Sequence, residues 1–283
     1  MTDAGSNSPH LEDDEQEQAG THAALSARVV HEIVRSEGEE EIERTAGQLI
    51  WSGLAAGLSM GFSFFVQAQL RSRLPDAPWS QLIDPLGYTV GFVIVVLGRQ
   101  QLFTESTLTA VLPVLTSRNG ATALRTLRLW AWVLAANLVG TWIFAIMLHL
   151  GHPFGPDVAP ALAAIAEHSV SGTFGRTCLE GVLAGWLIAL MVWLLPSAHS
   201  ARIIVILLIT YVVALAQFSH IIAGSAEAAY AVFIGTTNVW GYVWSFLVPT
   251  LIGNTVGGVV FVALLNHAPV SSDLHGNRGG TGG

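Results

Sequence analysis

Long stretches of this chain contain no Asp, Glu, Lys or Arg: residues 45–70, 129–156, 181–201, 203–226 and 228–272. A helix needs about 20 predominantly apolar residues to cross the hydrocarbon core of a bilayer, so these stretches predict membrane-spanning helices. Only 11% of all residues are charged, and 12 of the 20 acidic residues precede Arg44. The pattern predicts an integral membrane protein with an acidic N-terminal segment.

Six spanning segments can be placed on the sequence. Four are simple helices near residues 46–70, 121–149, 173–195 and 240–266. The other two, near 86–115 and 201–236, each have a polar interruption near the middle, at residues 99–105 and 217–230, with His220 central in the second. Polar or irregular backbone at membrane depth persists only where it is buried in protein or lines a water-filled path. Both interruptions therefore predict the lining or the support of a pore.

An internal repeat relates the two interrupted segments. The sequence ANLVGTWIFAIML, which starts at Ala136, matches GNTVGGVVFVALL, which starts at Gly253, at an offset of 117 positions. The same offset carries residues 102–104 onto 219–221. Three spans in each half give the halves opposite orientations, which is the layout of many transporters. We expect an all-α membrane protein with six transmembrane helices in two inverted three-helix repeats, whose second and fifth helices are broken.

The segments outside the membrane have distinct patterns. Residues 1–24 are acidic, unlike a signal peptide, and are expected to be a disordered tail. Residues 25–45 carry apolar side chains at helical spacing and predict a cytoplasmic amphipathic helix, which is either a solvated acidic helix or one that lies along the membrane surface. Residues 46–268 form the channel domain and 269–283 a flexible Gly-rich tail. The excess of Arg in the inner segments places both termini in the cytoplasm.

Three motifs together resemble the formate/nitrite transporter family over about residues 40–268: QLFTES in the second helix, FSH in the fifth and PTLIGNTVGG opening the sixth. The acidic N-terminus and GRQQLFTEST resemble its YfdC-type branch. The resemblance implies an aquaporin-like protomer in a homopentamer, with one pore per protomer, in a bacterial inner (plasma) membrane. It also implies passage of a small monovalent weak-acid anion such as formate or nitrite, in some cases together with a proton.

The resemblance also assigns roles to single residues. Leu102, Phe103 and Thr104 match the loop that narrows the cytoplasmic side of the pore, and His220 matches the central histidine, with Thr104 as its hydroxyl partner. Asn254 matches a pore-lining amide of the family. The outer hydrophobic constriction falls at Tyr88, Phe92 and Val213. An unperturbed histidine pKa of about 6.5 suits proton exchange or hydrogen bonding at such a position.

The chain departs from the family pattern at several positions. Ser169 stands where the family has an outer lysine, Gly185 where it has a pore-facing asparagine, and Ser219 where it has a glutamate. Arg99 and Glu105 add charges beside the first loop. We expect these two to pair with each other and brace the loop. In the alternative, an unpaired Glu105 facing the pore would disfavour anions.

Other classes of function remain as alternatives. The pore could take a neutral or cationic small solute, or the chain could be a nontransporting sensor or scaffold that uses its acidic tail. An enzyme is not expected, because His220 has no second His or Cys near it. No cofactor, metal or nucleic acid is expected, and the partners are a small solute, the lipid bilayer and further copies of the chain.

Overall fold

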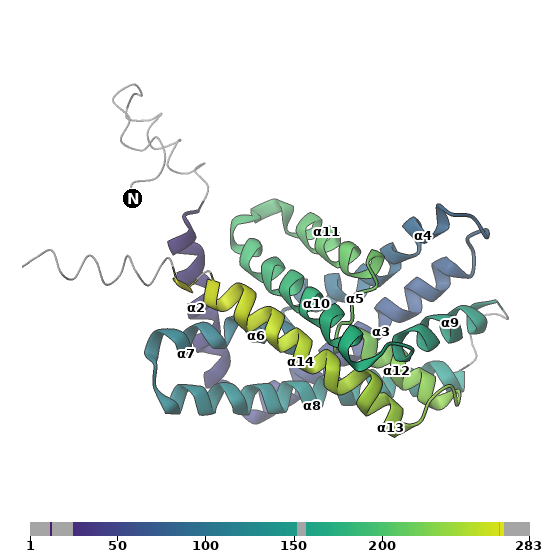
Figure 1. The fold of residues 1–283 in the computed structure, drawn as a ribbon. Helices are drawn as coiled ribbons and strands as arrows, with labels where there is room; N and C mark the ends of the chain where they lie inside the picture. The colour runs from purple at the N-terminus through teal and green to yellow at the C-terminus, as the bar shows by residue number, and fades with distance from the viewer. Residues whose placement is uncertain (1–11, 13–24, 152–156, 266, 269–283) are drawn as a thin grey trace, which may run out of the picture.

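The computed structural model describes residue 12 and residues 25–151, 157–265 and 267–268, which form helices joined by short connections (Figure 1). Most of the predicted acidic tail and the whole predicted C-terminal tail lie outside the described residues. Five helical segments in the described part are long and apolar enough to cross a membrane: Ala46–Arg71, Ser80–Leu97, Gly120–Gly151, Phe174–Ser197 and Val239–Leu264.

These five segments contain most of the labelled helices. They are α3 (Ala46–Arg71), α4 (Ser80–Ile83) with α5 (Pro85–Leu97), α8 (Gly120–Gly151), α10 (Phe174–Leu194), and a last segment made of α13 (Val239–Gly241), η3 (Tyr242–Leu247), α14 (Val248–Val256) and η4 (Gly257–Leu264). Large apolar side chains such as Leu124, Leu150 and Trp240 lie exposed on their outer surfaces. Exposed apolar surface on this scale is typical of contact with lipid or with further subunits.

The two interrupted segments are broken helices. The α5 helix stops at Leu97, and the chain resumes as α6 (Phe103–Thr109) and α7 (Val111–Ser117). The predicted segment 201–236 consists of α11 (Arg202–Leu215) and α12 (Ala223–Phe233), and each of these is too short to cross a bilayer alone. The loops 98–102 and 216–222 therefore lie between half-helices.

Glycines allow two pairs of helices to approach closely. A Cβ atom at Gly57 of α3 would lie 2.2 Å from the carbonyl oxygen of Asn137 on α8. A Cβ atom at Gly185 of α10 would lie 2.3 Å from the carbonyl oxygen of Asn254 on α14. Small residues permit this backbone contact inside membranes. Gly185 therefore faces α14, and it occupies a packing position where no side chain fits.

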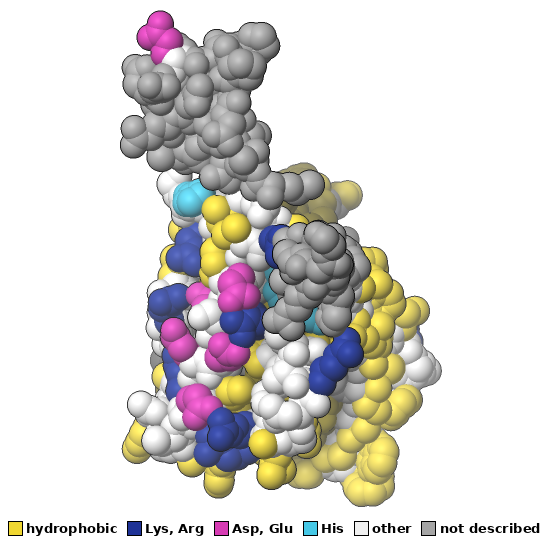
Figure 2. Space-filling view, turned by 90° about the vertical axis from the view of Figure 1, so that its left-hand side faces the viewer, with side chains coloured by type: hydrophobic (Ala, Val, Ile, Leu, Met, Phe, Trp, Pro, Cys, Tyr) yellow, Lys and Arg dark blue, Asp and Glu magenta, His cyan; other side chains and the backbone are white. Residues whose placement is uncertain are grey.

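Residues 25–45 contribute α2 (Ala27–Glu43), whose first turn is capped by the Ser26 side chain. The helix buries Val30, Val34 and Ile42, and it packs against α6, α7 and α8 of the same chain. Its apolar face is thus covered by protein. Figure 2 shows that Arg and acidic side chains gather on the face of the molecule where α2 lies.

One further helix, α9 (Val158–Val170), was not predicted. Its 13 residues are apolar but too few to cross a bilayer, so a search for spans passes over it. It packs on α12 and α3, at the end of the molecule away from α2 (Figure 1).

Candidate functional site: two loops and a vestibule

The two loops begin with the same backbone geometry. Arg99 and Gln217 both adopt left-handed conformations, with φ of 50° and 56°. The next residues, Gln100 and Phe218, each donate their N–H to the carbonyl oxygen five residues earlier, at 3.0 and 2.9 Å. A left-handed residue ends a helix sharply, because the chain leaves the helical path there. The helices α5 and α11 therefore end with the same backbone geometry.

The first loop is held by Asn137 of α8. Its Oδ1 accepts the N–H of Phe103 at 3.0 Å. Its Nδ2 donates to the carbonyl oxygens of Gly53 on α3, at 2.7 Å, and of Gln101 in the loop, at 2.9 Å. All four groups are removed from water, so the amide satisfies loop backbone that would otherwise be unpaired.

The second loop is held in the same way by Asn254 of α14. Its Oδ1 accepts the N–H of Ile221 at 2.8 Å, and its Nδ2 donates to the carbonyl oxygens of Gly181 and Ser219 at 2.8 and 2.9 Å. Asn254 was predicted to line the pore. The structure places its buried amide against three backbone groups, where it supports the loop.

The hydrogen bonds also correct the alignment of the two halves. They match Phe103 with Ile221, which is an offset of 118. The counterpart of His220 is therefore Leu102, and the prediction that Phe103 matches His220 is wrong by one residue. An offset of 117 aligns the helices that carry Asn137 and Asn254, whereas an offset of 118 aligns the two loops.

The loops meet at a buried pair. The Thr104 Oγ1 and His220 Nε2 atoms are 2.9 Å apart, and both residues are almost fully buried. The His220 Nδ1 accepts the backbone N–H groups of Ile222 and Ala223, at 3.3 and 3.2 Å. Because Nδ1 accepts, the proton of a neutral imidazole resides on Nε2 and is donated to Thr104. The two residues predicted to act together are thus in contact, and the tautomer follows from their neighbours.

Aromatic and aliphatic side chains cover one side of this pair. The ring centroids of Phe92 and His220 are 5.0 Å apart, and those of Tyr88 and Phe92 are 5.4 Å apart. Val213 of α11 is also fully buried. An apolar layer here is the arrangement predicted for a constriction that excludes hydrated ions.

The first loop also contributes apolar side chains near this pair. Leu102 and Phe103 are buried where α6 begins. The Phe103 ring contacts Trp130 edge to face, with centroids 5.7 Å apart. The polar pair therefore lies in buried, largely apolar surroundings.

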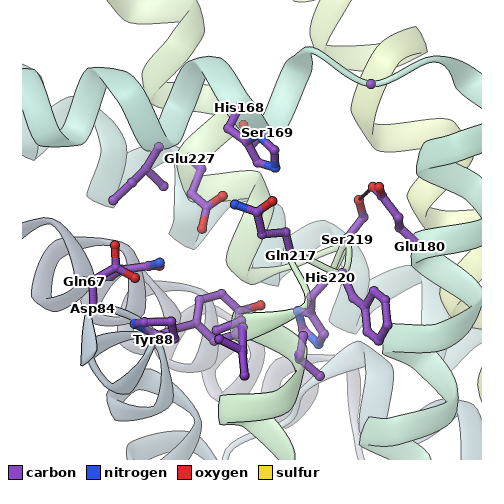
Figure 3. Close-up of a pocket in the computed structure, with 18 of the residues that line it drawn as sticks. Gln67, Asp84, Tyr88, His168, Ser169, Glu180, Gln217, Ser219, His220 and Glu227 are labelled. Atoms are coloured by element: carbon purple, nitrogen blue, oxygen red, sulfur yellow. Dashed lines mark hydrogen bonds between the residues drawn. The ribbon is translucent and has the colours of Figure 1, made fainter. Parts of the chain in front are cut away.

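A cavity of about 390 Å³ opens next to His220 on the side of α4 and α9 (Figure 3). We call it the distal vestibule, because it lies away from α2. Its lining includes five of the predicted site residues: Tyr88, Ser169, Val213, Ser219 and His220. The Ser169 hydroxyl donates to the Ala166 carbonyl oxygen at 2.8 Å, and the Ser219 hydroxyl donates to Glu180 at 3.2 Å.

The ion pairs of the distal vestibule were not predicted. Arg71 pairs with Asp84 at 2.8 Å, and Arg176 pairs with Glu180 at 2.7 Å. Glu227 also lines the cavity, and among the described residues it makes neither an ion pair nor a hydrogen bond. The sequence does carry a signal for Glu227, which is the single charged residue between positions 203 and 272.

The predicted pair between Arg99 and Glu105 is wrong. The Arg99 side chain is 75% exposed, and its guanidinium lies 3.2 Å from Glu37 of α2. The Glu105 Oε1 atom is buried without a hydrogen-bond partner among the described atoms. A long arginine side chain can reach the polar surface from the end of a half-helix, which the sequence pattern alone did not show.

The α2 helix braces the first loop through a different carboxylate. Glu41 accepts hydrogen bonds from Thr109 Oγ1 at 2.5 Å and from Gln101 Nε2 at 3.1 Å. Burial raises the pKa of the Glu41 carboxyl. Within the described part of the chain, no three His, Cys, Asp or Glu side chains are grouped so that they could hold a metal ion.

Broken helices that meet at a buried polar pair, apolar side chains around this pair and a vestibule beside it are typical of a multi-pass membrane channel or transporter. The family model for formate/nitrite transporters matches residues 28–268, so the chain belongs to this family. Inner membrane protein YfdC of Escherichia coli strain K12 is 41% identical over 252 residues, which cover 89% of this chain and 81% of that protein. The predicted family and branch are confirmed.

More distant relatives agree with this assignment. Formate channel BtFdhC of Bacillus thuringiensis is 26% identical over 82% of this chain and 91% of that protein. The structure described as a pentameric formate channel with formate bound has a TM-score of 0.69 at 23% identity, covering 79% of this chain and 97% of that one. An FNT family ion channel has a TM-score of 0.76 at 18% identity, covering 85% and 98%. The two structures show the same fold.

Proposed function

We propose that this chain conducts a small monovalent weak-acid anion of the formate or nitrite kind across a bacterial inner membrane. The observation that carries the proposal is the buried contact of Thr104 with His220 among apolar side chains. Relatives described as formate channels and an inner membrane protein support the solute class and the location.

The geometry suits a solute that is neutral when it reaches the centre. A bare anion among apolar side chains is costly, and its protonated form is far less so. Because Thr104 accepts from His220, its own hydroxyl hydrogen can be donated to a solute oxygen. His220 then acts by orienting this donor, and a proton travels with the anion.

The functional unit that we propose is a homopentamer with one pore in each protomer. The fold shared with a structure described as a pentameric formate channel supports it. The exposed apolar surfaces of the helices are suited to contact between subunits and with lipid. The gathering of Arg on the face of α2 supports a cytoplasmic location of the termini (Figure 2).

The test is a flux assay with the purified protein in liposomes. Formate, nitrite, hydrosulfide and ammonium uptake are compared across pH, with empty liposomes as the control. We expect uptake of the weak-acid anions, faster at lower pH. Uptake of ammonium alone would favour the cationic alternative, and no uptake of any of the four would favour a nontransporting sensor or scaffold.

A further inference from the structure

We propose that Glu227 is a specificity-determining residue of the distal vestibule. Its carboxylate keeps free anions out of the cavity and admits the solute as the uncharged acid. This inference rests on the proposed transport of a weak acid, and it names the form in which the solute enters.

The position of Glu227 gives it access to an entering solute. It lies on α12, two turns after His220, and its side chain points into the cavity (Figure 3). The figure places Gln67 and Asp84 on one side of it, Gln217 on the other and Tyr88 beneath. A solute moving towards the constriction therefore passes the Glu227 carboxylate.

Of the three acidic residues that line the cavity, Glu227 alone has no arginine partner among the described residues. Asp84 and Glu180 each have an arginine partner, Arg71 and Arg176, at 2.8 and 2.7 Å. The histidines His168 and His220 also line the cavity, and the hydrogen bonds of His220 define a neutral ring. With all three carboxyl groups ionised and His168 neutral, the vestibule carries a net charge of −1.

A purely structural role does not account for Glu227. A carboxylate that braces a fold is normally paired or hydrogen-bonded, because an unpaired buried charge is costly. In the described part of the structure, Glu227 has no such partner, and it lines the cavity. Its oxygens are therefore available to a solute.

The carboxylate distinguishes the two forms of a weak acid. Two negative charges about 4 Å apart repel each other enough to lower anion occupancy about fivefold even in bulk water, and more in a less polar cavity. The uncharged acid meets no such repulsion, and its O–H can donate a charge-assisted hydrogen bond to Glu227. The vestibule thus accumulates the species that the apolar constriction can pass.

The experiment compares native protein and Glu227→Gln in liposomes, with uptake of formate measured at fixed total concentration from about pH 5 to pH 8. In native protein, uptake should fall about tenfold per pH unit, because it follows the concentration of formic acid. In Glu227→Gln, uptake at about pH 8 should rise at least about fivefold, and its pH dependence should be shallower. Glu227→Lys should enlarge both changes.

The matched control is Glu167→Gln, which removes the same charge from an exposed side chain that is not part of the cavity lining. It should behave as native protein. Particle mass in detergent verifies that each variant assembles as native protein does.

Unchanged uptake and pH dependence in a well-assembled Glu227→Gln protein, or a loss of uptake, would overturn the role of Glu227 and leave the proposed function standing. If native protein and both Glu227 variants transport no formate at any pH, the proposed function fails, and the inference fails with it.

Discussion

Replacing Asn254 with Ala tests how the second loop is held. The change removes the hydrogen-bond acceptor of the Ile221 N–H. It also removes the donors to the carbonyl oxygens of Gly181 and Ser219. Asn254 is fully buried, so the cavity left behind cannot easily restore these hydrogen bonds. The loop that carries His220 should then lose its fixed position relative to Thr104.

The expected cost is large. A buried backbone group left without its partner costs about 1–3 kcal/mol, so three such groups cost together about 3–9 kcal/mol. Water from the distal vestibule can reach the Ser219 end of the loop, because Ser219 lines the cavity. The lower half of this range, roughly 3–6 kcal/mol, is therefore the expected loss of stability.

The assay is thermal unfolding in detergent, combined with formate uptake in liposomes. Asn238→Ala is the control, because Asn238 is exposed and its side chain accepts a single backbone N–H, that of Gly241, at 2.9 Å. The control should cost only about 1 kcal/mol. Asn254→Ala should unfold at a clearly lower temperature and lose uptake. Equal unfolding temperatures with native uptake in both variants would refute the reasoning.

Three further predictions follow from the structure. Gly185→Asn should prevent stable assembly, seen as a lower yield of oligomer in detergent, because even a Cβ would lie 2.3 Å from the Asn254 carbonyl oxygen; a stable oligomer would contradict this packing. Ser169→Lys should increase formate uptake at neutral pH by adding positive charge to the vestibule, and unchanged uptake would show that this charge does not limit entry. Burial lowers the pKa of His31 and His267, and His267 lowers that of His31 further. As pH falls below about 6.5, the two histidines take up protons in the unfolded state before they do so in the folded state. The stability that the pair contributes above this pH is therefore lost. Hydrogen exchange in α2, corrected for its intrinsic pH dependence, should be faster at about pH 6 than at about pH 8, and equal rates would contradict the prediction.

The helices of the membrane domain were largely predictable, because bilayer thickness imposes length and apolar composition on each continuous span. The two interruptions were also visible, since polar residues in such segments are rare. The contact between Thr104 and His220 followed from family resemblance, and the structure brings the two residues together.

Side-chain direction was less predictable. Arg99 reaches Glu37 of α2, a contact between residues 62 positions apart that no local pattern contains. Gly185 was assigned to the pore path because its close contact with α14 cannot be read from the sequence. Both errors concern contacts between residues that are far apart in the sequence.

Glu227 shows the opposite case, in which a visible signal was not used. It interrupts an otherwise charge-free sequence and was treated as part of a polar interruption. Its importance depends on Arg71 and Arg176, which come from two other helices and already have acidic partners. The excess of negative charge became apparent only once these pairs were located.

The most direct test of the central claim is formate uptake by native protein and by His220→Phe at matched insertion in liposomes. Phe retains an aromatic ring beside Phe92 but removes the donor to Thr104 and the acceptor for the N–H groups of Ile222 and Ala223. If the solute passes the Thr104–His220 pair, uptake should fall to that of empty liposomes while the oligomer remains intact. Native uptake with unchanged pH dependence in the variant would contradict a pore at this position.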